Sequence, residues 1–169
     1  MKEPTKTLLL SRHAKSSWKN PDLPDHDRPL NKRGQNDAPR MGKLLKDEDL
    51  IPDLIMSSTA ARAKKTAEFV AKACKYKRKV VLKHSLYGAE PAAYLQILEG
   101  LSDKQMAVLI VGHSPSVEET VEMLNGSLDV IMPTCALAHI SLPIQNWAEL
   151  KEQKVKGKLL KVWRPKELS

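Results

Sequence analysis

Residues 107–117 read AVLIVGHSPSV, an apolar run followed by a glycine, a histidine and a Ser-Pro pair. An unbroken apolar run of this length is typical of a parallel strand, which is buried on both faces of its sheet. Ser114 is a favourable helix N-cap and Pro115 a favourable first helical residue, so we expect a helix to begin directly after the strand. A strand that leads straight into a helix is the repeating step of an α/β fold.

The same alternation extends through the rest of the chain, where apolar runs predict strands and amphipathic stretches predict helices. The predicted strands are Thr7–Leu10, Leu54–Met56, Val80–Leu82, Ala136–Leu142 and Leu159–Trp163, and the predicted helices are Gly34–Lys46, Ala60–Cys74 and Pro91–Glu99. Pro39 and Gly42 are unfavourable within the first of these helices. The loop that contains Pro21, Pro24 and Pro29 is expected to hold no regular element. We therefore predict a three-layer α/β/α fold, with a mostly parallel central sheet and helices on both faces.

The chain has 169 residues, of which 41% are hydrophobic and 28% charged. This length fits a single domain over residues 1–169, because domains commonly contain about 100–200 residues. No apolar run approaches the ~20 residues of a membrane span, and the first residues lack the apolar core of a secretory signal. Cys74 and Cys135 follow no disulfide or metal-binding spacing and suit a reducing compartment. These features predict a soluble cytoplasmic protein without a membrane partner.

The chain carries 28 lysines and arginines against 20 acidic residues, a formal net charge of +8. Basic residues cluster at 72–83 and again at 151–166, which raises the question of nucleic-acid binding. Neither cluster is accompanied by an RNA-recognition aromatic pattern, a zinc-finger spacing or a helix-turn-helix signal, so we do not expect nucleic acid as a partner. A basic surface also suits an acidic or phosphorylated partner. The sequence assigns no role to the basic C-terminal segment.

Histidines and arginines follow three of the predicted strands. Arg12 and His13 follow the first strand, Arg62 lies one turn into the helix after the second, and His113 follows the strand at 107–111. Because functional groups in open α/β sheets gather at the carboxyl ends of the strands, we expect these four side chains to meet. Arginine presents forked donors that match phosphate oxygens, and helix starts add backbone N–H groups. The sequence therefore predicts a phosphate site.

Chemistry at such a site follows from the properties of imidazole. A neutral His13 could attack phosphorus and become a phosphohistidine. Arg12, Arg62 and His113 would stabilise the charge on the transferring group, which is most of what phosphoryl transfer requires. This mechanism needs no metal ion and no other cofactor.

The residues LLLSRHAKSSW at 8–18 resemble the signature of the histidine phosphatase superfamily, in the branch shared with phosphoglycerate mutases. The motifs Asp27–Leu30, Arg33-Gly34, Ser57-Ser58 through Arg62-Ala63, Thr66–Glu68 and Gly112-His113 resemble the SixA-type phosphohistidine phosphatases. The resemblance covers about residues 7–115 in order. It implies a phosphoglycerate mutase-like fold and a phosphatase that removes phosphate from phosphohistidine on a protein partner.

Carried over to this chain, the resemblance makes His13 the phosphorylated nucleophile and places Arg12, Arg62 and His113 in the phosphate pocket. Ser16, just past the nucleophile, is a further candidate for phosphate contact, although it also reads as a turn residue. Arg28 could reach the pocket from the proline-rich loop, and it reads equally well as a surface residue.

The chain departs from the superfamily pattern in ways that bear on the substrate. Many members have Gly where Ala14 stands and Asn where Lys19 stands, and they place a glutamate general acid near residues 86–88. No carboxylate occupies that place here, which leaves Glu90, Asp25 and Asp27 as the candidates. An alkoxide leaving group needs a proton from a positioned acid, whereas an imidazole leaves as a neutral ring when its second nitrogen is protonated. The missing acid therefore favours cleavage of a P–N bond at a shallow, open site.

Other interpretations remain open from the sequence. The protein could act on a small phosphate ester or phosphoramidate, or it could bind phosphohistidine without turnover. GHSPS at 112–116 nearly matches a serine nucleophile elbow, with Asp129 and His139 following in the order of a triad, but Ser116 replaces the final glycine. Asp22, Asp25, His26 and Asp27 lie close enough for a metal site, yet their spacing fits no established zinc or calcium motif.

Overall fold

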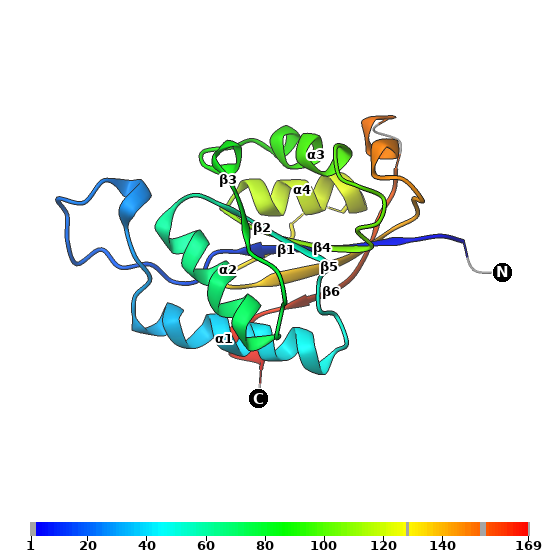
Figure 1. Cartoon of the computed structure of the whole chain (residues 1–169). Coiled ribbons are helices and arrows are strands. Elements are labelled where there is room, and N and C mark those ends of the chain that lie inside the picture. Colours follow the sequence, from blue (N-terminus) through cyan, green and yellow to red (C-terminus); the bar gives the residue numbers. More distant parts are fainter. Residues whose placement is uncertain (1–2, 128, 153–154, 169) are drawn as a thin grey trace.

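The computed structural model describes residues 3–127, 129–152 and 155–168. Its centre is a six-stranded sheet in the order β3-β2-β4-β1-β5-β6 (Figure 1). The strands are β1 Lys6–Arg12, β2 Leu54–Ser58, β3 Val81–Lys83, β4 Ala107–Gly112, β5 Leu137–Leu142 and β6 Lys158–Trp163. The first four strands are mutually parallel, and β5 and β6 are antiparallel to their neighbours. The prediction of a mostly parallel sheet is confirmed.

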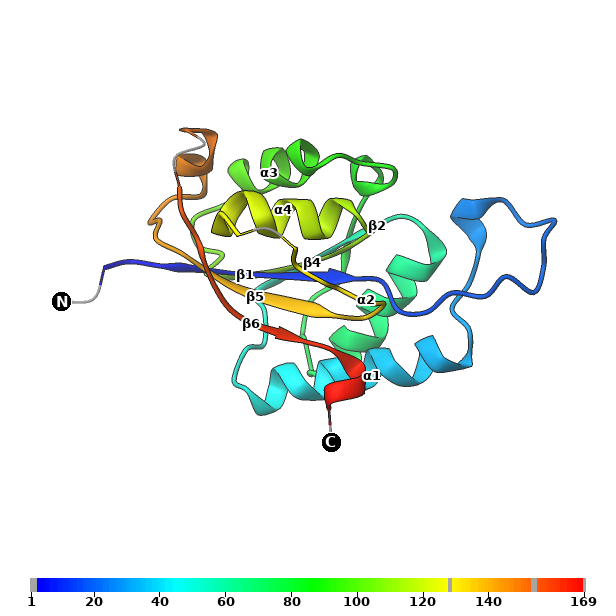
Figure 2. The same ribbon diagram turned by 180° about the vertical axis from the view of Figure 1, so that it is seen from behind.

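Helices cover both faces of this sheet, as Figures 1 and 2 show. On one face lie α1, Lys32–Asp47, and α2, Ala61–Ala73; on the other lie α3, Pro91–Glu99, and α4, Ser116–Asn125. Alternate residues of β1 point into the two layers because side chains alternate along a strand. Leu8 and Leu10 belong to the buried cluster beside α3 and α4, and Leu9 belongs to the cluster beside α1 and α2. The three-layer arrangement is therefore confirmed.

The helix α1 contains both Pro39 and Gly42, the two residues with unfavourable helix propensity. It also begins two residues earlier than predicted, because the Asn31 side chain accepts a hydrogen bond from the Gly34 amide at 2.9 Å and caps it. Gly42 faces α2 so closely that a Cβ atom there would lie 2.5 Å from the Val70 carbonyl oxygen. The glycine that weakens helix propensity thus permits the close packing of α1 on α2 that stabilises both helices.

Two local predictions are wrong. The helix α4 begins at Ser116 with Pro115 as its N-cap, and the Ser114 hydroxyl donates to the Glu118 carboxylate instead of capping the helix. The proline-rich loop, expected to be irregular, contains a 3-10 helix at Asp25–Asp27, where the Asp27 amide donates to the Pro24 carbonyl at 2.9 Å. Three further 3-10 helices lie at His84–Leu86, Trp147–Glu152 and Pro165–Glu167. None of the described helices is both long and apolar enough to cross a membrane.

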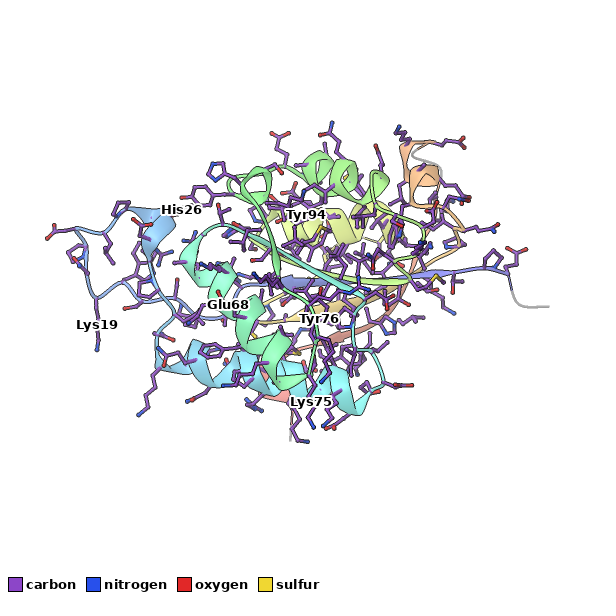
Figure 3. All side chains as sticks on the ribbon, in the orientation of Figure 1. Lys19, His26, Glu68, Lys75, Tyr76 and Tyr94 are labelled. Atoms are coloured by element: carbon purple, nitrogen blue, oxygen red, sulfur yellow. The ribbon has the colours of Figure 1, made fainter. Side chains whose placement is uncertain are left out.

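Side chains fill the layers on either side of the sheet, whereas the loop between β1 and α1 extends beyond them (Figure 3). Tyr94 of α3 is fully buried, and Lys19 lies exposed on the extended loop. Residues 13–31 thus form a long excursion at the carboxyl end of β1, next to the predicted site.

Candidate active site

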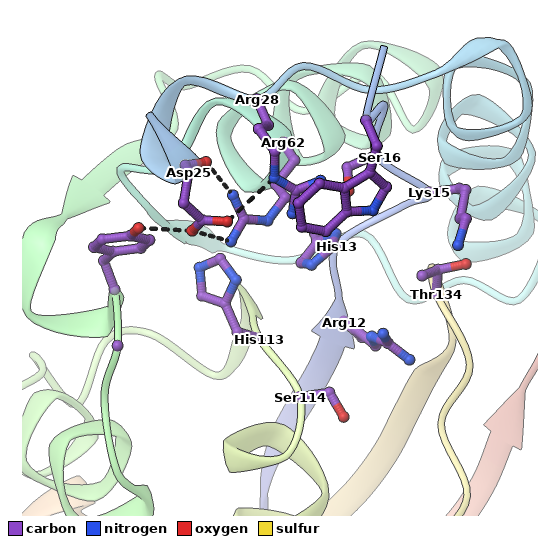
Figure 4. Close-up of a pocket in the computed structure, with 13 residues that line it drawn as sticks. Arg12, His13, Lys15, Ser16, Asp25, Arg28, Arg62, His113, Ser114 and Thr134 are labelled. Atoms are coloured by element: carbon purple, nitrogen blue, oxygen red, sulfur yellow. Dashed lines mark hydrogen bonds and ion pairs between the residues drawn. The ribbon is translucent and has the colours of Figure 1, made fainter. Parts of the chain in front are cut away.

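The carboxyl ends of β1, β2 and β4 meet at one edge of the sheet, where they border a cavity of about 420 Å³ (Figure 4). All six residues that the sequence analysis placed in the phosphate site line this cavity: Arg12, His13, Ser16, Arg28, Arg62 and His113. The cavity is lined by Arg12, His13, Lys15, Ser16, Trp18, Asp25, Arg28, Arg62, Tyr87, Gly88, His113, Ser114 and Thr134. The structure thus brings together residues that are up to 122 positions apart in the sequence, Arg12 and Thr134.

His13 is held rigidly at the floor of this cavity. Its amide donates to the Gly112 carbonyl at 3.0 Å, its carbonyl accepts from the Cys135 amide at 3.0 Å, and it is 8% exposed. The ring atom Nδ1 lies 2.7 Å from the Ala14 carbonyl oxygen. A carbonyl can only accept a hydrogen bond, so Nδ1 carries the proton and Nε2 keeps its lone pair.

The protonation state of His13 follows from its surroundings. Burial, followed by the nearby His113, Arg62 and Arg12, lowers the pKa of His13 to about 3, against the opposing hydrogen bond to the Ala14 carbonyl. The ring is therefore neutral at physiological pH. A neutral imidazole with an unprotonated Nε2 is competent as a nucleophile.

Two guanidinium groups flank His13 with unused donors. Arg12 donates from Nη1 to the Met132 carbonyl at 3.2 Å, and Arg62 donates from Nη1 to the Asp25 carbonyl at 2.7 Å. Both Nε atoms are buried, and neither has a hydrogen-bond partner among the described residues. Because two guanidiniums line one cavity and each has five N–H donors, the arrangement suits an anion with several oxygens.

The second histidine is positioned by the end of β4 and by α3. The His113 amide donates to the Tyr94 hydroxyl at 3.2 Å, and its Nε2 lies 2.8 Å from the Ser58 hydroxyl. Gly112 makes this possible, because a Cβ atom there would lie 2.1 Å from the Tyr94 oxygen. The rings of His13 and His113 have their centroids 5.3 Å apart. Burial and then the charge of Arg62 lower the pKa of His113 to about 4, so it is also neutral.

Ser16 and Arg28 also reach the cavity, and they contact each other. Arg28 donates from Nη1 to the Ser16 hydroxyl at 2.8 Å. Its guanidinium lies 3.5 Å from the ring centroid of Trp18, a side chain that is 70% exposed at the rim. Arg28 is therefore a buried member of the pocket and not a surface residue.

Of the three candidate acids, only Asp25 lines the cavity. Its carboxylate accepts hydrogen bonds from Tyr87 Oη at 2.7 Å, Arg62 Nη2 at 3.0 Å and Arg28 Nε at 3.1 Å. These bonds, with that from Tyr87 the strongest influence, hold the pKa of Asp25 below its usual range although partial burial opposes them. Glu90 is the N-cap of α3 and Asp27 pairs with His26 at 3.6 Å, both outside the cavity lining.

Sequence reasoning assigned no role to Tyr87 or Thr66. The Thr66 hydroxyl accepts from the Ala14 amide at 2.9 Å and donates to the Arg62 carbonyl at 2.7 Å, so it ties α2 to the loop after His13. Its position four residues after Arg62, on the same helix face, is a signal that could have identified it. Tyr87 reaches Asp25 across 62 residues of sequence, and no local pattern indicates that contact.

The structure does not assemble the alternative sites. The ring of His139 stacks on Trp163 with centroids 5.9 Å apart, and the Ser114 hydroxyl is bonded to Glu118, so no serine triad forms. Within the described part of the chain, no group of three or more His, Cys, Asp or Glu side chains is arranged to hold a metal ion.

Comparisons with known proteins agree with this geometry. The sequence model of the Histidine phosphatase superfamily (branch 1) matches residues 8–87. The solved structure of a candidate phosphohistidine phosphatase, SixA from Agrobacterium tumefaciens, is 30% identical, with a TM-score of 0.79 over 97% of this chain and 100% of that one. A similar candidate from Nakamurella multipartitia is 27% identical, with a TM-score of 0.83 over 95% and 96% of the two chains.

A curated relative of this chain is a chloroplastic protein of Arabidopsis thaliana. It is 31% identical over 154 residues, which cover 86% of this chain and 70% of that protein. The chain spans about two thirds of the length of the first curated relatives that it matches.

Proposed function

Since this chain belongs to branch 1 of the histidine phosphatase superfamily, we propose that it removes phosphate from phosphohistidine on a protein partner. In this proposal His13 is the nucleophile, and the reaction passes through a phosphorylated His13. The two similar solved structures, from Agrobacterium tumefaciens and Nakamurella multipartitia, are of candidate phosphohistidine phosphatases, which supports this substrate class.

One observation carries the proposal. The Nδ1–H of His13 is committed to the Ala14 carbonyl, so the lone pair of Nε2 is available in a cavity that Arg12 and Arg62 also line. Because each guanidinium has N–H donors beyond those bonded to Met132 and Asp25, Arg12 and Arg62 can bind the phosphoryl oxygens while Nε2 attacks phosphorus. His113, beside His13, contributes a hydrogen bond to the transferring group.

The reaction then has two displacement steps. In the first, the bond between phosphorus and His13 Nε2 forms as the substrate P–N bond breaks. In the second, water attacks the phosphorus of phosphorylated His13, and inorganic phosphate leaves with His13 restored. Arg12, Arg62 and Arg28 supply positive charge throughout, so we propose that the reaction requires no metal ion.

The proposed substrate is protein-borne because the cavity opens beside exposed groups. Its border includes Trp18, which is 70% exposed, and several residues of the loop 13–31. An exposed, partly aromatic rim suits a phosphorylated side chain presented on a protein surface.

Phosphate release from a phosphohistidine-bearing protein, in the presence of EDTA, tests the proposal. We expect His13→Ala to abolish turnover and to prevent labelling of the chain by radioactive substrate phosphate, whereas wild type forms an acid-labile phosphoenzyme. Arg62→Ala should weaken both phosphate binding and rate. His139→Ala, which alters a histidine stacked on Trp163 away from the cavity, is the control and should keep wild-type turnover. Full activity of the His13 variant, or loss of activity in EDTA, would contradict the proposal.

A further inference from the structure

The cavity has a floor that holds the nucleophile and a mouth that faces solvent. His13 and Arg62 are 8% and 6% exposed, whereas the side chain of Asp25 is 51% exposed. In phosphoryl transfer the attacking and leaving atoms lie roughly in line on opposite sides of phosphorus. The leaving group of a substrate attacked by His13 therefore points towards the mouth, where Asp25 and Tyr87 lie.

Asp25 is the only acidic side chain among the described residues that line this cavity. Arg62 holds it from the phosphate side: Nη1 bonds the Asp25 carbonyl and Nη2 bonds its carboxylate, while Nε remains unpaired. Each of the two Nη nitrogens carries a second N–H, so a single guanidinium can bind a phosphoryl oxygen and keep its bonds to Asp25. The Asp25 carboxylate therefore lies beside the place where substrate would bind, and Figure 4 shows the bonds that hold it to Arg62.

From this placement we infer that Asp25 accepts a hydrogen bond from the second ring nitrogen of the leaving imidazole, and so makes the site specific for P–N substrates. The inference rests on the proposed function and extends it. It gives the leaving group a contact with Asp25, whereas the residues proposed to bind phosphate contact only the phosphoryl group.

The chemistry balances without any added reactant. Before reaction, the phosphorylated imidazole takes a proton from solvent on its second nitrogen, and the Asp25 carboxylate stabilises that cation. As His13 Nε2 bonds to phosphorus, the P–N electron pair returns to the substrate nitrogen. The leaving imidazole is then neutral, and its N–H remains hydrogen-bonded to Asp25. An ester has no N–H at this place, so the same carboxylate would repel its developing alkoxide.

The groups that face Asp25 keep its side chain in the ionised carboxylate form, which accepts hydrogen bonds. They are Arg62 from α2, Arg28 from the same loop, Tyr87 after the 3-10 helix His84–Leu86, and His113 from the end of β4. Two fixed positive charges and a hydroxyl donor stabilise the carboxylate form, which cannot serve as a general acid for an ester. This accounts for a pocket that contains a carboxylate and still lacks the acid that ester hydrolysis needs.

The test compares two small substrates, phosphoimidazole and p-nitrophenyl phosphate, on wild type and Asp25→Asn. We expect kcat/KM for phosphoimidazole to fall about 10–100-fold in the variant, the range for losing a hydrogen bond to a charged group. The value for p-nitrophenyl phosphate should stay level or rise. The kcat/KM of wild type for phosphoimidazole should also persist to higher pH than that of the variant, because the carboxylate favours the protonated ring. Asp22→Asn, which removes a charge from the exposed part of the same loop, should match wild type.

Tyr87→Phe provides a second variant that keeps the carboxylate and removes only one of its donors. It should retain the preference for phosphoimidazole that Asp25→Asn loses.

Two results with Asp25→Asn would contradict the inference. An equal fall in kcat/KM for both substrates would show that Asp25 only orders Arg62 and Arg28, and an equal rise would show that it competes with phosphate. Either result overturns the inference while leaving the proposed function intact. Failure of wild type to cleave phosphoimidazole and phosphohistidine would instead refute the proposed function itself.

Discussion

At the scale of single residues, the proposed reaction depends on a hydrogen bond between a side chain and the carbonyl of the very next residue. The bond from His13 Nδ1 to Ala14 selects the tautomer with a free Nε2. Burial then removes the competing proton, since the cation would be poorly solvated among Arg12, Arg62 and His113. Arg12 and Arg62, which we propose to bind phosphate, therefore also help to keep the proposed nucleophile neutral.

A neutral nucleophile predicts an activity profile that persists into acid. An ordinary histidine, with a pKa near 6.5, would lose about 90% of its neutral form by pH 5.5. With the pKa of His13 at about 3, we expect kcat/KM for p-nitrophenyl phosphate, corrected for ionisation of the substrate, to change less than about threefold between pH 7.5 and 5.5. A tenfold fall over this interval would mean that His13 titrates normally.

Residues at strand ends could be predicted from the sequence, and residues that act across loops could not. Arg12, Arg62 and His113 were placed together because the carboxyl ends of parallel strands share an edge. Asp25 was one of three equivalent acids, and its selection depends on contacts with Arg62 and Tyr87, 37 and 62 residues away. Such contacts leave no periodic pattern in the chain, so local reasoning treats Asp25 as a loop residue.

At the scale of elements, α2 and the loop after β1 are joined by Thr66. Its hydroxyl satisfies the Ala14 amide, one residue from the nucleophile, and at the same time bonds back to Arg62. This buried hydroxyl thus links the loop after His13 to Arg62, in addition to the backbone bonds that hold His13 itself. The corresponding feature of α4 is Thr120, whose buried hydroxyl donates to the Ser116 carbonyl at 2.7 Å and has no loop to hold.

We therefore expect Thr66→Val to reduce both stability and turnover, although valine has nearly the same shape as threonine. The substitution leaves the buried Ala14 amide unsatisfied, which we expect to lower the free energy of unfolding by about 1–3 kcal/mol. Turnover should also fall, because the loop that carries His13 loses its tether. Urea unfolding and steady-state kinetics measure the two effects. Thr120→Val removes a similar backbone-directed bond and should cost less stability and no activity; equal effects of the two variants would contradict this role for Thr66.

The element predictions succeeded where a segment is buried in a layer and failed where side chains compete for the backbone. Burial explains why the run at 107–111 appears as β4 and the amphipathic stretch at 60–74 as α2. Ser114 has the chemistry of an N-cap, yet its hydroxyl finds Glu118, and α4 starts two residues later. Whether a short polar side chain such as Ser114 bonds to the helix backbone or to a nearby side chain depends on the three-dimensional positions of its neighbours. The residue types alone do not reveal these positions.

At the scale of the whole molecule, the buried histidines couple stability to pH. The native pKa values of His13 and His113, about 3 and about 4, lie below the ordinary value of 6.5. The unfolded chain therefore binds more protons than the native protein below pH 6.5. Stability from these groups is complete above pH 6.5 and is lost as the pH falls towards 4. Asp25, whose native pKa is also lowered, acts in the same sense, but only below the ordinary aspartate pKa of about 3.9.

We expect the free energy of unfolding to decrease by roughly 2 kcal/mol for each of these two histidines between pH 7.5 and pH 5. Urea unfolding at both pH values measures the change. A variant with His13→Gln and His113→Gln should lose most of this pH dependence while unfolding cooperatively. A pH dependence as steep as that of wild type would place its origin elsewhere in the protein.

The strand order has a consequence for synthesis of the protein on the ribosome. β1 and β2 are made first, but they are not neighbours, because β4 lies between them. A nascent chain that stops before residue 107 carries His13 in the loop after β1 and Arg62 on α2, and it lacks β4, the strand that joins β1 to β2. The lining of the pocket is complete only after Thr134 has been added. We therefore expect the pocket to form late in translation, because a prematurely terminated chain that ends before β4 lacks the lining residues His113, Ser114 and Thr134.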